Sequence, residues 1–147
     1  MDQNFRFRFD SILAYKEKKE EKAKQIMSEA VKALEEERKK LNDLKIQHEM
    51  ALERWKQDIK EQQKIYEVQI KSNQIQWLVD MIEIQKNKLT KAEVEVEKCR
   101  SLLIEAKKET KKFEKIREND YESFKAEFKK MEAAQIDQFV SYKSATK

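Results

Sequence analysis

The chain contains no glycine and no proline among its 147 residues, so it lacks the two residues that most often punctuate local structure. Phosphate-binding loops and dinucleotide-binding fingerprints need glycine where the backbone approaches the phosphates. The sequence therefore excludes an ATPase or an oxidoreductase built on those motifs. A single cysteine, Cys99, permits no internal disulfide, which is typical of proteins from a reducing compartment.

Long apolar runs are also missing. No stretch approaches the roughly 20 apolar residues of a membrane span, and the first five residues lack the apolar run of a signal peptide. We therefore expect a cytoplasmic protein without direct membrane insertion. The only histidine, His48, has no second histidine four residues on, so no zinc-protease pattern is present. Cys99 has no activating base nearby in the sequence. We expect no metal, no cofactor and no catalytic residue.

Charge dominates what is present. Forty-two per cent of the residues are charged and 39% are hydrophobic, which is typical of long helices and coiled coils when glycine and proline are absent. Disorder is the alternative for so polar a chain, but a sustained apolar periodicity argues against it. The net charge is +4 with the two signs interleaved, and no undiluted basic region precedes the repeats. The sequence thus predicts no nucleic-acid partner.

Apolar residues recur at alternating steps of three and four along two arms of similar length, which predicts coiled-coil seams. We expect an all-α fold in which residues 1–147 form one domain, a long antiparallel two-helix coiled coil or helical hairpin. Such a thin rod has no concave interior for a small ligand. The predicted seam of the first arm is Ala23, Met27, Ala30, Leu34, Glu37, Leu41, Leu44, His48, Ala51 and Trp55. The predicted seam of the second arm is Leu78, Ile82, Gln85, Leu89, Ala92, Val96, Cys99, Leu103, Ala106, Thr110 and Phe113, continuing less regularly through Phe124, Phe128, Met131, Gln135 and Phe139.

The reversal between the arms must be made from polar residues. Ser72 and Asn73 are good helix N-caps, and Gln76 lies three residues after Asn73, as in a capping box. We therefore predict a first arm over about residues 5–70, a turn at about 71–74 and a second arm over about 74–142. Contacting residues would then have numbers that sum to roughly 145, with Trp55 near Leu89 and Phe9 near Ile136. A single unbroken helix remains the alternative, because nothing in this stretch forbids helix.

Two apolar features exceed what a two-helix seam needs. At the free end, Phe5, Phe7 and Phe9 alternate with charged residues ahead of Leu13 and Tyr15. Period two is a strand signal, but six residues without a partner strand cannot form a sheet, so we predict an extended lead-in. Its aromatic side chains either seal the end of the coiled coil or dock into another protein.

The second feature lies close to the predicted turn. Trp77, Met81 and Ile84 form a stripe about 100° round the helix from the seam, and Tyr66 lies in the preceding turns. Such a stripe is either exposed, and then a partner site, or covered by a local bundle. Both interpretations stay open at this stage.

The opening residues 5–16, Phe-Arg-Phe-Arg-Phe-Asp-Ser-Ile-Leu-Ala-Tyr-Lys, resemble the flagellar export protein FliJ family. The family has an aromatic lead-in, then a leucine, a basic residue and a helix rich in Glu and Lys. The length, the helical hairpin and the segment Trp77–Ile82 agree with the same resemblance. Phe9 stands where many members of the family carry an aliphatic residue.

The resemblance implies a stalk of the bacterial flagellar type III export apparatus, similar to the central stalk subunit of rotary ATPases. Its expected partners are the hexameric export ATPase, the cytoplasmic domain of the export gate and export chaperones, at the cytoplasmic face of the flagellar basal body. On this basis we assign Phe5, Phe7, Phe9, Leu13 and Tyr15 to the ATPase end. The gate end would then comprise Tyr66, Trp77, Met81 and Ile84. A structural coiled-coil scaffold or tether without a flagellar role is the alternative function.

Overall fold

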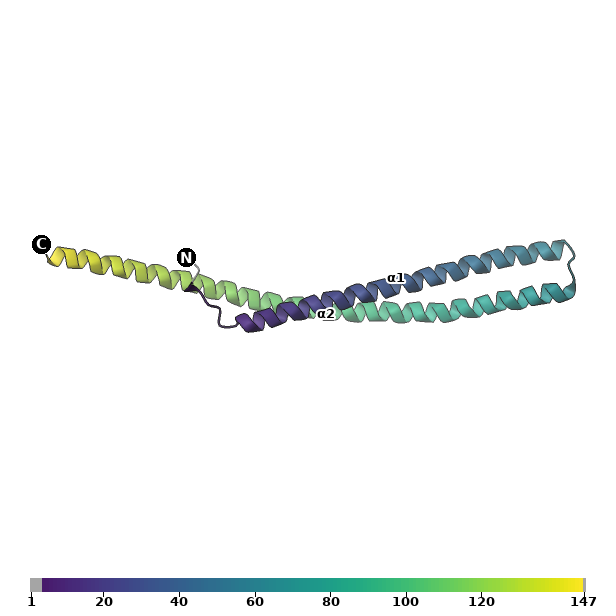
Figure 1. Ribbon diagram of the computed structural model, residues 1–147, viewed down its shortest axis with the longest axis horizontal. Helices are drawn as coiled ribbons and strands as arrows, with labels where there is room; N and C mark the ends of the chain where they lie inside the picture. Colours follow the sequence, from purple (N-terminus) through teal and green to yellow (C-terminus); the bar gives the residue numbers. More distant parts are fainter. Residues whose placement is uncertain (1–3, 147) are drawn as a thin grey trace. The chain divides into compact units, whose positions relative to one another are not determined.

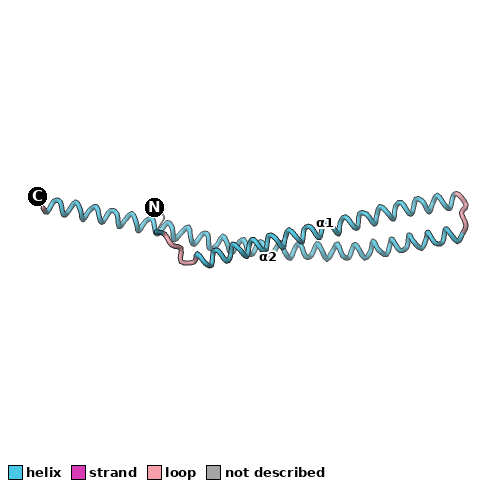
Figure 2. Tube along the Cα trace, in the orientation of Figure 1, coloured by secondary structure: helices cyan, strands magenta, loops and turns pink. Residues whose placement is uncertain are grey.

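The structure, a computed structural model, describes residues 4–146 and contains two long helices. Helix α1 spans Asp10–Lys60 and helix α2 spans Ile65–Ala145, with a short turn between them (Figure 1). The tube in Figure 2 shows the rest of the described chain as a lead-in before α1 and this turn, with no strand. The helices pack against each other as an antiparallel hairpin, so the predicted fold class is confirmed. That the chain is a single domain stays a prediction.

Burial follows the predicted seam on α1 and on α2 as far as Phe124. The predicted continuation through Phe128, Met131, Gln135 and Phe139 is wrong, because these side chains lie past the start of α1 and are exposed. Every predicted seam position of the first arm from Ala23 to Trp55 is buried or half-buried, and so is every one of the second arm from Leu78 to Phe113. These positions are buried because steps of three and four keep one face of each helix turned toward the partner. Polar residues in the seam form hydrogen bonds across it. Gln85 Nε2 donates to the backbone carbonyl of Glu37 at 3.1 Å, and Thr110 Oγ1 donates to that of Lys16 at 3.2 Å.

The turn lies at residues 61–64, and the predicted position at 71–74 is wrong, because those residues continue helix α2. Helix α1 ends in a Schellman motif, in which the last carbonyls accept from N–H groups just past the helix. The N–H of Gln63 donates to the carbonyl of Asp58, and the N–H of Gln62 donates to that of Ile59, both at 3.2 Å. Gln62 has a φ of 55° and fills the left-handed position that glycine usually takes.

The shifted turn changes which residues meet. Contacting residues on the two helices have numbers that sum to about 125, as the pairs Lys16–Glu109 and Glu37–Gln85 illustrate. The predicted proximity of Trp55 to Leu89 and of Phe9 to Ile136 is therefore wrong. Trp55 Nε1 instead donates to the carbonyl of Val68 at 3.2 Å. The ring of Phe9 meets that of Phe113, with 6.1 Å between centroids.

The described residues fall into two compact units. One contains the chain up to Lys22 together with the chain from Ile104 onward, and the other contains Ala23–Leu103. In the first unit, α1 and its lead-in cover α2 only as far as Phe124. Every residue from 125 to 146 is exposed. The sequence did not indicate this unpaired segment, which follows from a turn that lies ten residues nearer the start of the chain.

Candidate partner-binding surfaces

The three phenylalanines assigned to the ATPase end, Phe5, Phe7 and Phe9, form an aromatic cluster with rings of α2 in the first unit. Phe7 and Leu13 are buried, with 7% and 6% of their surface exposed. The ring of Phe5 lies 5.2 Å from that of Tyr121, edge to face, and 5.4 Å from that of Phe124. Edge-to-face and tilted aromatic pairs stabilise packing beyond the area they bury. The lead-in is thus held against α2, so these phenylalanines seal the free end of the hairpin.

Polar contacts support the same arrangement. Arg8 Nε donates to Asp120 Oδ2 at 3.2 Å, which ties the lead-in to α2. The guanidinium of Arg8 also lies 4.7 Å from the centroid of the Phe9 ring, a cation–π geometry. Tyr15 differs from the other four assigned residues, because 60% of its surface is exposed. Of this set, Tyr15 is the side chain most available to a partner.

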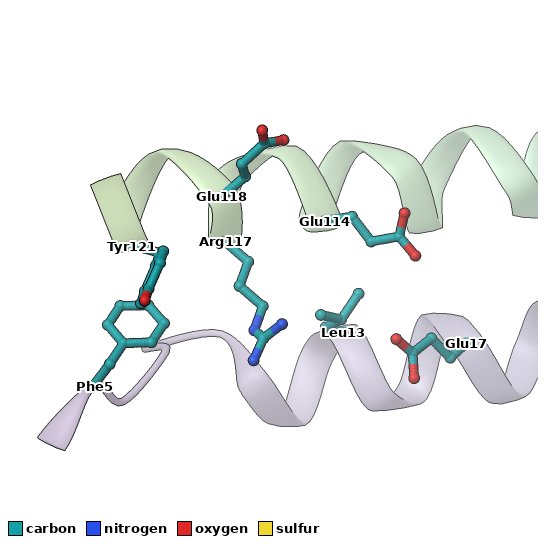
Figure 3. A pocket seen from close by; sticks show the side chains of 7 residues that line it. All are labelled: Phe5, Leu13, Glu17, Glu114, Arg117, Glu118 and Tyr121. Carbon is teal, nitrogen blue, oxygen red and sulfur yellow. The ribbon is translucent and has the colours of Figure 1, made fainter. Parts of the chain in front are cut away.

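A groove of about 600 Å³ opens beside this cluster. Figure 3 shows the rings of Phe5 and Tyr121 together at one end, and the side chain of Arg117 reaching from α2 toward α1. Leu13 forms an apolar part of its lining, whereas the carboxylate of Glu118 points away from the groove. The remaining lining residues are Glu17 and Glu114. With Glu118 directed away, the two carboxylates of Glu17 and Glu114 against the one guanidinium of Arg117 leave the lining negatively charged, so it suits a basic side chain better than an anion.

The residues assigned to the gate end lie along one side of α2 in the second unit. Tyr66 and Trp77 expose 74% and 58% of their surface, Ile84 is also exposed, and Met81 is half-buried. The structure therefore answers the question that the sequence left open, since no local bundle of residues 4–146 covers this stripe. Ile70, four residues after Tyr66 and seven before Trp77, is exposed on the same side of the helix. The sequence analysis did not identify Ile70, although its spacing of seven residues from Trp77 places it on the same helix face.

The residues with reactive side chains are placed for packing. His48 is half-buried in the seam, and Cys99 is buried there with 3% of its surface exposed. Burial raises the pKa of the Cys99 thiol, and the nearby carboxylate of Glu95 raises it further. A thiol with a raised pKa is a poor nucleophile at neutral pH. Within residues 4–146, no three His, Cys, Asp or Glu side chains gather in a way that could hold a metal ion.

Across the described part of the chain, neither helix has an apolar stretch long enough to cross a membrane.

Comparison with known proteins gives one result. A family model described as "Flagellar FliJ protein" matches residues 5–147. No curated protein and no solved structure matches the chain.

Proposed function

Because the chain belongs to the FliJ family of flagellar proteins, we propose that it is a stalk that links the flagellar export ATPase to the export gate. Family membership indicates a flagellar export component. The family match over residues 5–147 carries the proposal, since it covers nearly the whole chain rather than a generic coiled-coil segment. In this proposal the chain binds the ATPase hexamer, promotes its activity and has no catalytic residue of its own. Export chaperones are further partners in the same proposal, and the place of action is the cytoplasmic face of the basal body.

Two exposed surfaces support separate partner contacts. Tyr15 lies in the first unit, and the stripe of Tyr66, Ile70, Trp77 and Ile84 lies in the second. We assign Tyr15 to direct contact with the ATPase, whereas Phe5, Phe7, Phe9 and Leu13 position the lead-in and α1 around it. A large aromatic residue with exposed surface is a frequent anchor of protein interfaces.

The stripe is assigned to the export gate. Trp77 offers a large rigid area, and the half-buried Met81 beside it adapts to an irregular surface. Exposed apolar side chains that are contiguous on one helix face mark interaction sites more often than isolated ones do. The charge-poor stretch of α2 around Trp77 agrees with this, because interface cores are depleted of charged residues.

Binding to the two partners tests the proposal. The purified chain is titrated into the flagellar export ATPase and, separately, into the cytoplasmic domain of the gate, both from the same organism. We expect saturable binding to each and a rise in the rate of ATP hydrolysis that saturates with the ATPase titration. A chain that binds neither protein and leaves ATP hydrolysis unchanged would instead be a scaffold without this role.

A further inference from the structure

An apolar stripe continues along α2 past the point where its partner helix begins. Residues 125–146 are exposed throughout, and within them Phe128, Met131, Phe139 and Tyr142 expose large apolar surfaces. Together with Gln135 they lie within about 80° of one another around the helix, given 100° per residue. We call these five residues the terminal stripe. A helix that has water on every side is expected to carry polar residues all round rather than an apolar stripe.

The terminal stripe is continuous with the interface inside the hairpin. The ring of Phe128 stacks on that of Phe124, with 6.3 Å between centroids and 25° between planes, and Phe124 in turn contacts Phe5. A surface depression on this segment is lined by Glu132, Gln135, Ile136 and Phe139. These residues have the spacing i, i+3, i+4, i+7 of the four that form a hole for a side chain of a facing helix in a coiled coil. The occupant that this surface fits is therefore another helix.

We propose that this helix is residues 125–145 of a second copy of the chain, running antiparallel. The spacing of the terminal stripe is symmetric about Gln135, with members four and seven residues away on each side. An antiparallel copy then matches layer for layer, with Phe128 facing Tyr142 of the second copy and Met131 facing Phe139 of the second copy. Gln135 also marks the middle of the unpaired segment 125–145. Two copies thus overlap over the whole exposed segment and stop where Phe5 already covers Phe124.

The chemistry of each layer suits this pairing. Aromatic rings meet in the outer layers, and a methionine sulfur meets a phenylalanine ring in the next. The central layer brings together two Gln135 side chains, each of which has both donors and an acceptor, and a polar central layer fixes register. The same alignment places Glu127 level with Lys143 of the second copy, and it places no two charges of the same sign level with each other. Charge therefore does not oppose the association.

The size of the interface sets its strength. A segment of about 20 residues with one stripe buries less than a standard interface of about 800 Å² per partner, so the dimer forms only at micromolar concentrations or above. Two copies joined in this way would cover each other's terminal stripe. The inference stands apart from the proposed function, because it concerns a surface not assigned to the ATPase or the gate.

Sedimentation equilibrium over about 1 to 300 µM tests the association. The purified chain should shift from monomer to dimer across this range, and Met131→Glu should raise the dissociation constant at least about tenfold. Val140→Glu is the matched control, because Val140 is 56% exposed but lies about 140° round the same helix from Gln135. Equal helicity by circular dichroism establishes that both variants fold. A chain that stays monomeric, or a Val140→Glu loss equal to that of Met131→Glu, overturns the proposal.

Disulfide trapping tests the antiparallel register. In a Cys99→Ala background, Gln135→Cys should form a cross-linked dimer under mild oxidation, because the two-fold axis brings the two residues together. Phe128→Cys alone should not, since antiparallel pairing separates the two residues by roughly 20 Å along the helix, beyond the reach of a disulfide. The pair Phe128→Cys and Tyr142→Cys, mixed from two preparations, should cross-link again. Efficient cross-linking of Phe128→Cys by itself would indicate a parallel or unspecific contact and overturn the proposed pairing.

Discussion

At the scale of single residues, the backbone conformation of Gln62 determines the geometry of the turn. Its φ of 55° places it in the left-handed region, which costs an L-residue with a side chain roughly 1–2 kcal/mol. Glycine adopts this conformation without that cost, but it also loses more backbone entropy on folding, by roughly 0.5–1 kcal/mol. The chain contains no glycine, so the Schellman motif at the end of α1 forms with a glutamine and keeps this strain.

Replacing Gln62 by glycine should therefore stabilise the hairpin. We expect Gln62→Gly to raise the free energy of unfolding by about 0.5–1 kcal/mol, because relief of the left-handed strain exceeds the added entropy loss. Urea denaturation followed by circular dichroism measures the change. Gln63→Gly is the matched control, because Gln62 is the only non-glycine residue with positive φ among residues 4–146. A gain no larger for Gln62→Gly than for Gln63→Gly would show that the left-handed position costs nothing.

Cys99 gives a prediction about pH. Burial and the carboxylate of Glu95 raise the pKa of its thiol in the folded chain above the value in the unfolded chain, near 8.5. The folded state then holds the proton more tightly, so the thiol's contribution to stability is complete below about pH 8.5 and is lost as the pH rises further. We expect the stability advantage of the native chain over Cys99→Ala to shrink between pH 7 and pH 9.5. Because the other titrating groups are the same in both chains, their effect cancels in the difference between the two free energies of unfolding. A difference that stays constant across this pH range would contradict the raised pKa of Cys99.

At the scale of the helices, periodicity predicted the fold and most of the seam, whereas the turn could not be located. The seam from Ala23 to Trp55 follows from the spacing of apolar residues, because only one face of each helix is buried. Good N-caps at Ser72 and Asn73 misled the prediction of the turn, because N-cap residues are also tolerated inside a helix that tertiary packing stabilises. The actual turn at residues 61–64 has no glycine, no proline and no strong cap. Its position depends on how the two seams align, which local sequence does not encode.

The same limit applies to the candidate surfaces. Trp77 and its neighbours lie off the seam whatever the position of the turn, so the sequence could predict the stripe but not its exposure. The partner of Phe9 depends on the alignment of the helices and was mispredicted with it. The unpaired end of α2 follows from the difference between helices of 51 and 81 residues, which becomes visible only once the turn is placed.

Two deletions separate the roles of the chain ends. Removing residues 126–147 should leave the free energy of unfolding of the hairpin within about 0.5 kcal/mol, since residues 126–146 are exposed and Phe128 stacks on Phe124 of the same helix rather than on α1. Removing residues 1–9 should lower it by about 2–4 kcal/mol, because Phe7 is buried and Phe5 and Phe9 make ring contacts with α2. Thermal and urea unfolding measure both effects. A destabilisation by the first deletion as large as that by the second would contradict the unpaired arrangement of the end of α2.

At the scale of the whole molecule, each of the two units has its own exposed surface, whereas the seam residues are buried between the helices. A chain of this kind binds partners by its exposed side chains, and its open groove beside Phe5 offers no enclosed ligand site. The proposed function therefore divides between Tyr15 for the export ATPase and Trp77 for the export gate. Each side chain is exposed, so its removal should leave the fold intact.

Titration of two variants against two partners tests this division most directly. Tyr15→Ala and Trp77→Ala are each titrated against the export ATPase and against the cytoplasmic domain of the gate, with thermal unfolding as the control for folding. We predict that Trp77→Ala weakens gate binding by about 2 kcal/mol, roughly 30-fold, and leaves ATPase binding unchanged. Tyr15→Ala should weaken ATPase binding and leave gate binding unchanged. Equal losses for both partners in either variant, or no loss in any of the four titrations, would contradict the account.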